Sequence, residues 1–277
     1  MRYLVCLFII IISSCTNANR SIKVKGSDTE VNLAVSLAEN FYNVNTDFSL
    51  AISGGGSGLG IASLLNGQTD IANSSRPLND EEIALLKAKR IPIRTVIFAE
   101  DATAFIVQKN FPLDSIDITT LTKVLNGKYR SWKPVTGQNV LINIYGRQSN
   151  SGTHSFISKK LKIEFSRDAK EMNGNAQIVE GIKRDGSGIG YVGAGYILHN
   201  GTNGPVKVLK ISEKLGLPAV SPLDKKAIAA HRYYFQRPLY QFIPLTSWSK
   251  VASFIDFEKG IAGQRIITSL GYYIISQ

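Results

Sequence analysis

The fold is indicated most strongly by Gly146-Arg147-Gln148-Ser149-Asn150-Ser151-Gly152-Thr153-His154-Ser155-Phe156, which follows a predicted strand and opens a predicted helix. A helix start carries unpaired N–H donors and the positive end of the helix dipole, so it favours an anion. Arg147 adds a forked guanidinium that suits a tetrahedral oxyanion. On its own the segment is equally compatible with an ordinary cap, in which Ser151 caps the helix and Arg147 lies on the surface.

Two earlier turns repeat this arrangement. The strand 22–25 ends at Ser27, Asp28 and Thr29, and the apolar residues between 31 and 41 then follow helical spacing. The strand 48–52 runs into the glycine-rich segment 53–60, which contains Ser57 and precedes a helix over 61–66. Successive glycine amides can form an anion nest, although a flexible turn is the commoner meaning of such a run. No Gly-Lys-Ser/Thr follows, so this is not a P-loop.

The remaining chain alternates strands and helices. A short strand, 70–73, leads to Ser75 and Arg76, and Asn79 caps the next helix with Glu82 three residues on. We expect crossing strands at 93–99 and 102–108, joined by an acidic pair at 100–101, and a third crossing segment at 233–242. Further expected elements are helices over 118–126, 168–182, 248–259 and 262–270, and strands over 140–145 and 206–211.

One motif imitates a nucleotide site. Gly188, Gly190 and Gly193 have the spacing of a dinucleotide fingerprint. That fingerprint requires a preceding strand and an acidic residue at the end of the next strand, and neither occurs here. The segment is therefore interpreted as a strand whose glycines allow close packing.

Composition and charge describe a folded protein with anionic partners. The 277 residues carry a formal charge of +11, with 44% hydrophobic and 19% charged residues. This length allows one large domain or two smaller ones. The positive charge favours phosphates, nucleic acid or an anionic membrane face. Basic residues are not interleaved with aromatic ones, which disfavours a nucleic-acid surface.

The N-terminus reads as a secretory signal. The apolar run 4–12 is too short for a permanent membrane span, and small residues then precede Cys15, as in the lipobox of bacterial lipoproteins. We expect a lipid on Cys15 and an extracytoplasmic, membrane-anchored protein, with residues 1–20 as signal peptide and tether. The alternative is an ordinary cleaved signal. The other cysteine, Cys6, lies in the segment to be removed, so no internal disulfide is expected.

Catalytic signatures are absent from the sequence. There is no Gly-x-Ser-x-Gly elbow, and the three histidines lie far apart without metal-ligand spacing. A serine nucleophile would need His154 beside a local serine, whereas we expect that ring to point elsewhere. The sequence therefore predicts binding rather than turnover, with no metal and no cofactor.

Taken together, the motifs resemble those of the substrate-binding protein of the phosphate ABC importer. The resemblance spans residues 22 to 274. An arginine four residues before Ser-Gly-Thr is quite specific in combination with the other segments, whereas each glycine run alone is weak. The matching segments are Gly26-Ser27-Asp28-Thr29, Gly54-Gly55-Gly56-Ser57-Gly58, Asp70 to Arg76, Arg147 with Ser151-Gly152-Thr153, Ile189-Gly190-Tyr191, Arg237-Pro238-Leu239-Tyr240 and Gly263-Gln264-Arg265 to Tyr272.

This resemblance implies an α/β, type II periplasmic-binding fold with a ligand cleft between two lobes. Lobe I would comprise 21–99 plus 231–277, and lobe II 100–230. The implied partners are inorganic phosphate and the membrane permease of an ABC importer, without nucleic acid, and we expect a monomer. The implied phosphate-binding residues are Ser27, Thr29, Ser57, Ser75 with Arg76 nearby, Arg147, Ser151, Gly152 and Thr153.

One position departs from the pattern. Many relatives carry Asp where this chain has Ser75, and that carboxylate accepts the proton of hydrogen phosphate and rejects sulfate. We expect Asp28 to take its place, since it lies in another of the converging turns. The alternatives are the same fold with sulfate or molybdate, an extracytoplasmic adhesin or sensor that uses the surface, and hydrolysis by Ser57 or Ser151.

Overall fold

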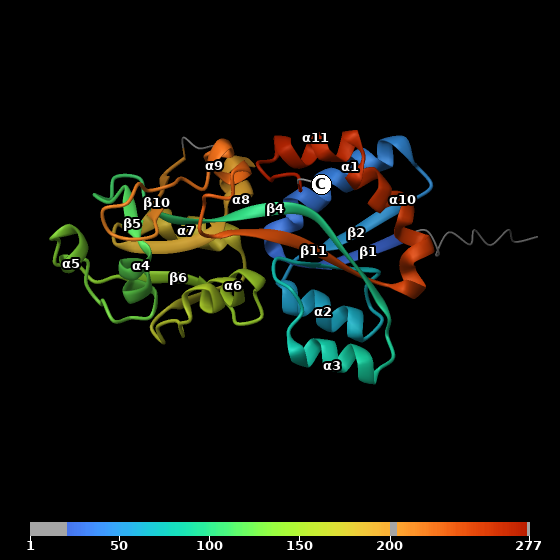
Figure 1. Cartoon of the computed structure of the whole chain (residues 1–277), viewed down its shortest axis with the longest axis horizontal. Helices are drawn as coiled ribbons and strands as arrows, with labels where there is room; N and C mark the ends of the chain where they lie inside the picture. The colour runs from blue at the N-terminus through green and yellow to red at the C-terminus, as the bar shows by residue number, and fades with distance from the viewer. Residues whose placement is uncertain (1–20, 200–203, 276–277) are drawn as a thin grey trace, which may run out of the picture.

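The computed structural model describes residues 21–199 and 204–275, which form two α/β lobes lying side by side (Figure 1). The predicted signal segment, the tether and Cys15 lie outside these residues. The strands are β1 (Ser21–Gly26), β2 (Ser49–Ser53), β3 (Ile71–Ser74), β4 (Ile93–Gln108), β5 (Ser115–Asp117), β6 (Asn143–Arg147), β7 (Lys170–Met172), β8 (Gly188–Gly193), β9 (Val206–Val208), β10 (Lys210–Ser212) and β11 (Gln236–Pro244).

Helices alternate with these strands, as the sequence periodicity predicts. They are α1 (Val31–Val44), α2 (Ser57–Leu65), α3 (Asp80–Ala88), α4 (Ile118–Leu125), α5 (Lys133–Thr136), α6 (Gly152–Leu161), α7 (Asn175–Arg184), α8 (Ala194–His199), α9 (Lys225–Ala229), α10 (Trp248–Lys259) and α11 (Ile261–Ser269), with 3₁₀ turns η1 (Asp28–Glu30) and η2 (Leu245–Ser247). None of the helices in the described ranges is long and apolar enough to cross a membrane.

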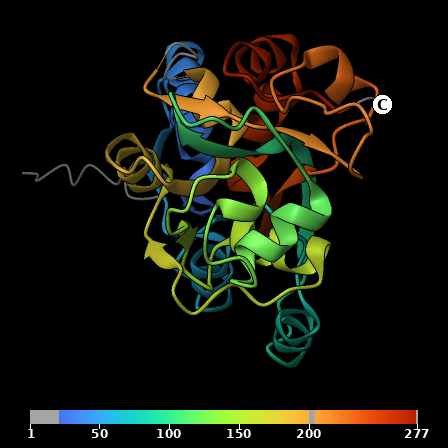
Figure 2. The ribbon, with the colours of Figure 1, turned by 90° about the vertical axis from the view of Figure 1, so that its left-hand side faces the viewer.

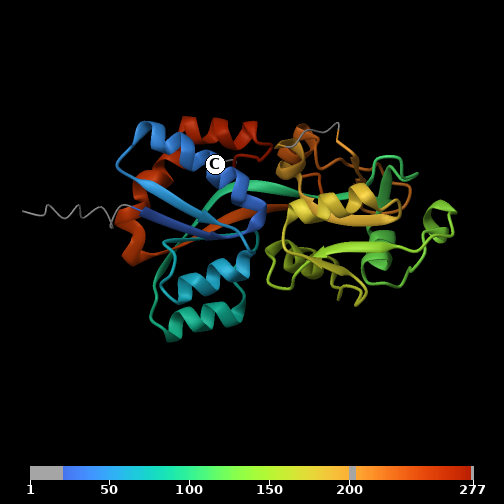
Figure 3. The same cartoon turned by 180° about the vertical axis from the view of Figure 1, so that it is seen from behind.

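A single curled sheet runs through both lobes. Its strand order is β2-β1-β3-β11-β4-β8-β6-β7, and β9 also pairs with β4. In lobe I, β1 pairs in parallel with β2 and β3. Helices α1 and α11 cover one face of this half, and α2 and α3 cover the other (Figures 1 and 3).

Two long antiparallel strands connect the lobes. The predicted segments 93–99 and 102–108 are one continuous strand, β4, and β11 returns beside it. The acidic pair predicted to join two strands lies inside β4. Asp101 pairs with Arg237 in the register, so these two side chains meet directly at the crossing. Figure 2 views the molecule from the lobe II end, with the crossing strands behind.

Each lobe has a hydrophobic core of its own. One cluster contains Ile22, Phe98 and Leu239, and another contains Phe105 and Phe235. The core therefore changes between Ala99 and Ala102 on β4, next to the proposed boundary at 99/100. On the return path the change falls after Phe235, which is slightly later than residue 231. A third, smaller cluster lies under α2 and α3.

Two secondary-structure predictions are wrong. The expected helix over 168–182 begins only at Asn175, because residues 170–172 pair with β6 as the edge strand β7 and Gly174 is extended. Tertiary pairing overrides the helical composition here. The expected strand 206–211 is split, since β9 pairs with β4 while β10 pairs with β5.

The glycine-rich segment near residue 190 is a strand, as predicted. A Cβ built on Gly190 would lie 2.5 Å from Cγ2 of Ile178 on α7. That helix can pack on β8 only because the strand lacks a side chain there. Close packing, not nucleotide binding, explains the glycine spacing.

Candidate anion-binding site between the lobes

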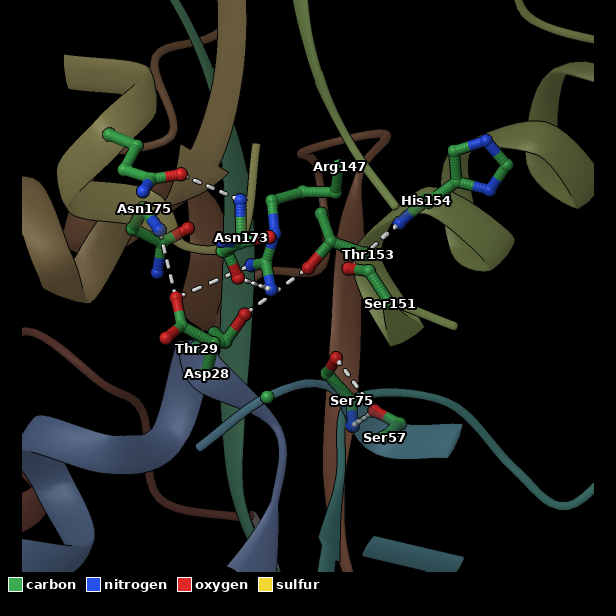
Figure 4. A network of polar contacts seen from close by, with 12 residues as sticks. Asp28, Thr29, Ser57, Ser75, Arg147, Ser151, Thr153, His154, Asn173 and Asn175 are labelled. Carbon is green, nitrogen blue, oxygen red and sulfur yellow. Dashed lines mark hydrogen bonds and ion pairs between the residues drawn. The ribbon is translucent and has the colours of Figure 1, made fainter. Parts of the chain in front are cut away.

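Four turns supply the predicted donors, and each follows a strand end. The turns after β1, β2 and β3 belong to lobe I, and the turn after β6 belongs to lobe II (Figure 4). The carboxyl ends of parallel strands meet at one edge of a sheet, which is where ligands of open α/β folds bind. The donor side chains are each at most 3% exposed: Ser27, Thr29, Ser57, Ser75, Arg147, Ser151 and Thr153.

The hydroxyl groups of the two lobes meet directly. Thr29 Oγ1 of lobe I lies 3.2 Å from Thr153 Oγ1 of lobe II. Within lobe I, Ser57 Oγ accepts the Ser75 N–H at 3.1 Å and lies 3.5 Å from Ser75 Oγ. Gly152 faces this pair, because a Cβ there would lie 2.2 Å from Ser57 Oγ. The structure thus brings Thr29, Ser57, Ser75, Gly152 and Thr153 together, whereas the Ser27 side chain hydrogen-bonds Glu30.

The glycine run also contacts the opposite lobe. Gly58 donates its N–H to the carbonyl of Asn150 at 2.9 Å, and Asn150 Nδ2 donates to the carbonyl of Gly55 at 3.3 Å. Gly55 and Gly56 have φ of 112° and 105°, a conformation that side-chain-bearing residues rarely adopt. Glycine is therefore needed for the shape of this loop and for its close approach to lobe II.

Arg147 is buried with one donor left over. Its Nη1 donates to Asp28 Oδ2 at 3.3 Å, and its Nη2 donates to the carbonyl of Asn173 at 2.9 Å. The Nε donor finds no acceptor among the described residues. Burial lowers the pKa of Arg147 below its usual value, partly offset by Asp28. A buried cation with a spare donor favours an anionic guest.

Asp28 connects the lobes. Its Oδ2 accepts the Asn175 N–H at 2.8 Å as well as the Arg147 guanidinium. Asp28 belongs to lobe I, whereas both of its partners belong to lobe II. The carboxylate therefore lies in the seam beside the hydroxyl cluster (Figure 4). Its predicted role as acceptor of the phosphate proton stays a prediction.

Arg76 is engaged elsewhere. Its guanidinium forms a bidentate pair with Glu82 at 2.6 and 2.7 Å and also donates to the carbonyl of Pro77. Glu82 is at the same time the N3 residue of the Asn79 capping box. The Arg76 side chain therefore braces the start of α3, and the structure does not bring it to the hydroxyl cluster.

Ser151 has the capping role that its position predicts. Its Oγ accepts the His154 N–H at 3.4 Å at the start of α6. The His154 ring packs against Phe165 with centroids 4.6 Å apart, so it points away from Ser151, as expected. Among the described residues, no group of three or more His, Cys, Asp or Glu side chains is arranged to hold a metal.

Sequence reasoning missed a buried ion pair beneath the cluster. Arg237 donates to Asp101 Oδ2 through Nη2 at 3.0 Å and through Nε at 3.3 Å. The same Nη2 lies 3.3 Å from Thr29 Oγ1 and 3.0 Å from Thr153 Oγ1. Pairing the predicted crossing strands around residues 93–108 with the crossing segment 233–242 in register would have placed these opposite charges side by side.

Similar proteins share this architecture. A phosphate-binding protein, PstS, from Borreliella burgdorferi is 28% identical over 271 residues, covering 94% of this chain and 92% of the relative. The crystal structure of PstS from Borrelia burgdorferi matches with a TM-score of 0.57 at 28% identity, covering 93% of this chain and 100% of that one. A substrate-binding protein from Clostridium perfringens, solved with bound phosphate, matches with a TM-score of 0.81 at 22% identity, covering 92% and 100%.

The family assignment rests on most of the sequence. A model of the PBP superfamily domain matches residues 13–257, which include every turn of the site. The two-lobed architecture and the strand-end location of the donors agree with this match. The chain therefore belongs to the PBP superfamily.

Proposed function

We propose that this protein binds inorganic phosphate between its lobes and delivers it to an ABC importer. The carrying observation is the meeting of Thr29, Ser57 and Ser75 of lobe I with Gly152 and Thr153 of lobe II, beside the buried Arg147 (Figure 4). Relatives that match nearly the whole chain are named phosphate-binding proteins.

The donor chemistry suits a small tetrahedral anion. A desolvated dianion needs a donor near each oxygen lone pair, and hydroxyls and backbone amides supply donors without a fixed carboxylate pair. The helix starts at α2 and α6 add dipole stabilisation of ~0.3–1 kcal/mol each. Hinge closure of the two lobes around the ligand would complete the shell. The proposed ligands are Ser27, Thr29, Ser57, Ser75, Arg147, Ser151, Gly152 and Thr153, with Asp28 as proton acceptor.

Location and partners follow from the same proposal. Retention at the membrane would come from a lipid on Cys15, with residues 16–20 as the tether. The receiving partner would be the permease of the importer. The protein itself would release phosphate unchanged, without a cofactor.

Calorimetric titration of the chain from residue 16 onward tests the function. We expect binding of phosphate at micromolar or lower Kd, about −8 kcal/mol or better, and no comparable binding of sulfate or molybdate. Preference for sulfate or molybdate would reassign the ligand within the same fold. Binding of none of the three anions would refute the receptor function and favour a role for the outer surface.

A further inference from the structure

Arg237 has an unusual position for a charged residue. It lies on β11 at the crossing between lobes and is only 3% exposed. Its guanidinium also lies over the Phe156 ring of α6, 5.2 Å from the ring centroid. A buried arginine is costly unless it is paired and hydrogen-bonded, and Asp101 pairs it from the neighbouring strand.

The guanidinium reaches three of the four donor turns. Its Nη2 contacts the hydroxyls of Thr29 and Thr153, and its Nη1 donates to the carbonyl of Ser75 at 3.4 Å. Thr29 and Ser75 belong to lobe I, whereas Thr153 belongs to lobe II. One side chain on the hinge therefore contacts both halves of the proposed phosphate site.

The direction of these hydrogen bonds matters for an anion. Nη2 carries two hydrogens and has three acceptors within 3.3 Å, so its N–H groups are shared among Asp101 Oδ2 and the two threonine hydroxyls. Because a guanidinium has only donors, a threonine hydroxyl that contacts it accepts and directs its own O–H elsewhere. Thr29 and Thr153 lie 3.2 Å apart, so one hydroxyl can donate to the other. The second O–H is then left to donate to a ligand, as a phosphate oxygen requires.

We propose that Arg237 is a positioning residue for phosphate, which fixes the Thr29 and Thr153 hydroxyls so that one of them donates to the anion. Asp101 fixes the guanidinium against the crossing strands. This inference rests on the proposed phosphate binding. It adds a charged pair on the hinge to the predicted ligand set.

Burial and charge balance of the Arg237–Asp101 pair suit a positioning role. Asp101 is fully buried, and its Oδ2 accepts both hydrogen bonds from Arg237. Burial raises the pKa of Asp101, and the Arg237 charge opposes that rise. Because the carboxylate offsets most of the arginine charge, the pair offers directed donors with little net charge.

Titration of phosphate into Arg237→Gln tests the proposal. We expect the Kd to rise at least tenfold, since hydrogen bonds to charged groups are among the stronger ones. The matched control is Arg94→Gln. Arg94 lies on β4, the strand that pairs with β11, and its guanidinium carbon lies 3.9 Å from the ring centroid of Trp248. That control should bind phosphate as the unaltered protein does.

A double-mutant cycle with Thr153→Val separates positioning from simple bracing of the hinge. If Arg237 acts through the threonine hydroxyls, the double variant Arg237→Gln/Thr153→Val binds phosphate only slightly more weakly than the weaker-binding of the two single variants. Additive losses would overturn the inference, as would an Arg237→Gln protein that binds phosphate within twofold of the unaltered chain.

Arg237→Lys guards against a variant that fails to fold. Lysine keeps the charge but not the forked donor geometry, so we expect a several-fold rise in Kd with a melting temperature near that of the unaltered protein. If Arg237→Gln does not fold, a lysine variant that binds within twofold overturns the inference. Failure of the unaltered chain to bind phosphate would instead refute the proposed function itself.

Discussion

At the scale of single residues, Asp28 joins the lobes and is also the proposed acceptor of the phosphate proton. It accepts from Arg147 and from the Asn175 N–H across the lobe seam. A carboxylate beside a bound anion repels sulfate but can accept the proton of hydrogen phosphate. We predict that Asp28→Asn weakens phosphate binding and relaxes discrimination against sulfate, as measured by paired titrations with both anions.

The size of the effect can be bounded. Losing a charged acceptor for two hydrogen bonds costs ~1.5–3 kcal/mol each at most, and the asparagine carbonyl retains part of that. Unchanged affinity and unchanged selectivity in Asp28→Asn would mean that this residue only starts the turn η1. The hydrogen bond from Arg147 to Asp28 would then make no contribution to phosphate binding.

Gly152 offers a steric test of lobe contact. A Cβ at this position would lie 2.2 Å from Ser57 Oγ and 2.5 Å from Ser75 Oγ, across the seam. We predict that Gly152→Ala reduces phosphate affinity at least tenfold, because closure must be incomplete, while the melting temperature changes little. Gly186→Ala is the matched control, since its Cβ would meet nothing within 4 Å. Equal affinities of both variants would contradict the steric argument.

At the scale of elements, helix α10 carries a carboxyl that should make stability depend on pH. Glu258 is 1% exposed, and Gln241 donates to its Oε1 at 3.1 Å. Burial raises the pKa of Glu258 to about 8. As pH rises from about 4 to 8, the Glu258 carboxyl therefore stays protonated in the folded chain but is ionised in the unfolded chain. The contribution of Glu258 to stability is greatest below the unfolded pKa and falls as pH rises towards 8.

We predict that the free energy of unfolding decreases between pH 5 and 8 and that Glu258→Gln makes this decrease smaller. Each group that is neutral when folded and ionised when unfolded contributes ~1.4 kcal/mol per pH unit to the slope. Urea unfolding at several pH values measures it. Glu180→Gln, an exposed glutamate paired with Lys183, is the control and should leave the slope unchanged. An unaltered slope in Glu258→Gln would contradict the assignment of a neutral carboxyl.

Local signals predicted most elements but not their pairing. Apolar periodicity and caps located α1, α3, α4 and α10, because each signal lies within the element itself. The edge strand β7 was missed because its strand character comes from pairing with β6, not from Lys170 to Met172. The same limit hid Arg237 and Asp101, whose proximity exists only once β4 and β11 pair.

The predicted site shows the same division. Strand-turn-helix motifs and the family resemblance pointed to Ser57, Gly152 and Thr153, and the structure places all three at helix starts in the seam between the lobes. Arg76 directly follows Ser75 in the sequence, but its side chain is directed to Glu82, six residues on, and not to the hydroxyl cluster. The side-chain direction at Arg76 depended on a helix cap, which the ligand motif did not reveal.

At the scale of the whole molecule, one group of contacts across the seam between the lobes centres on Asn150. The Asn150 amide donates to Gly55, and the Asn150 carbonyl accepts from Gly58. Both contacts join the loop before α6 to the glycine run of lobe I. Contacts of this kind hold a closed receptor together and thereby slow ligand release.

We predict that Asn150→Ala accelerates phosphate release several-fold while changing the association rate little, because the side-chain bond to Gly55 forms only when the lobes meet. The backbone bond to Gly58 survives the substitution, so binding is weakened but not abolished. Stopped-flow release experiments measure the rate, and Asn139→Ala, which alters an exposed asparagine within lobe II, is the matched control. Equal release rates in the two variants would mean that closure depends on the ligand and the buried Arg147–Asp28 contact, with no contribution from this loop.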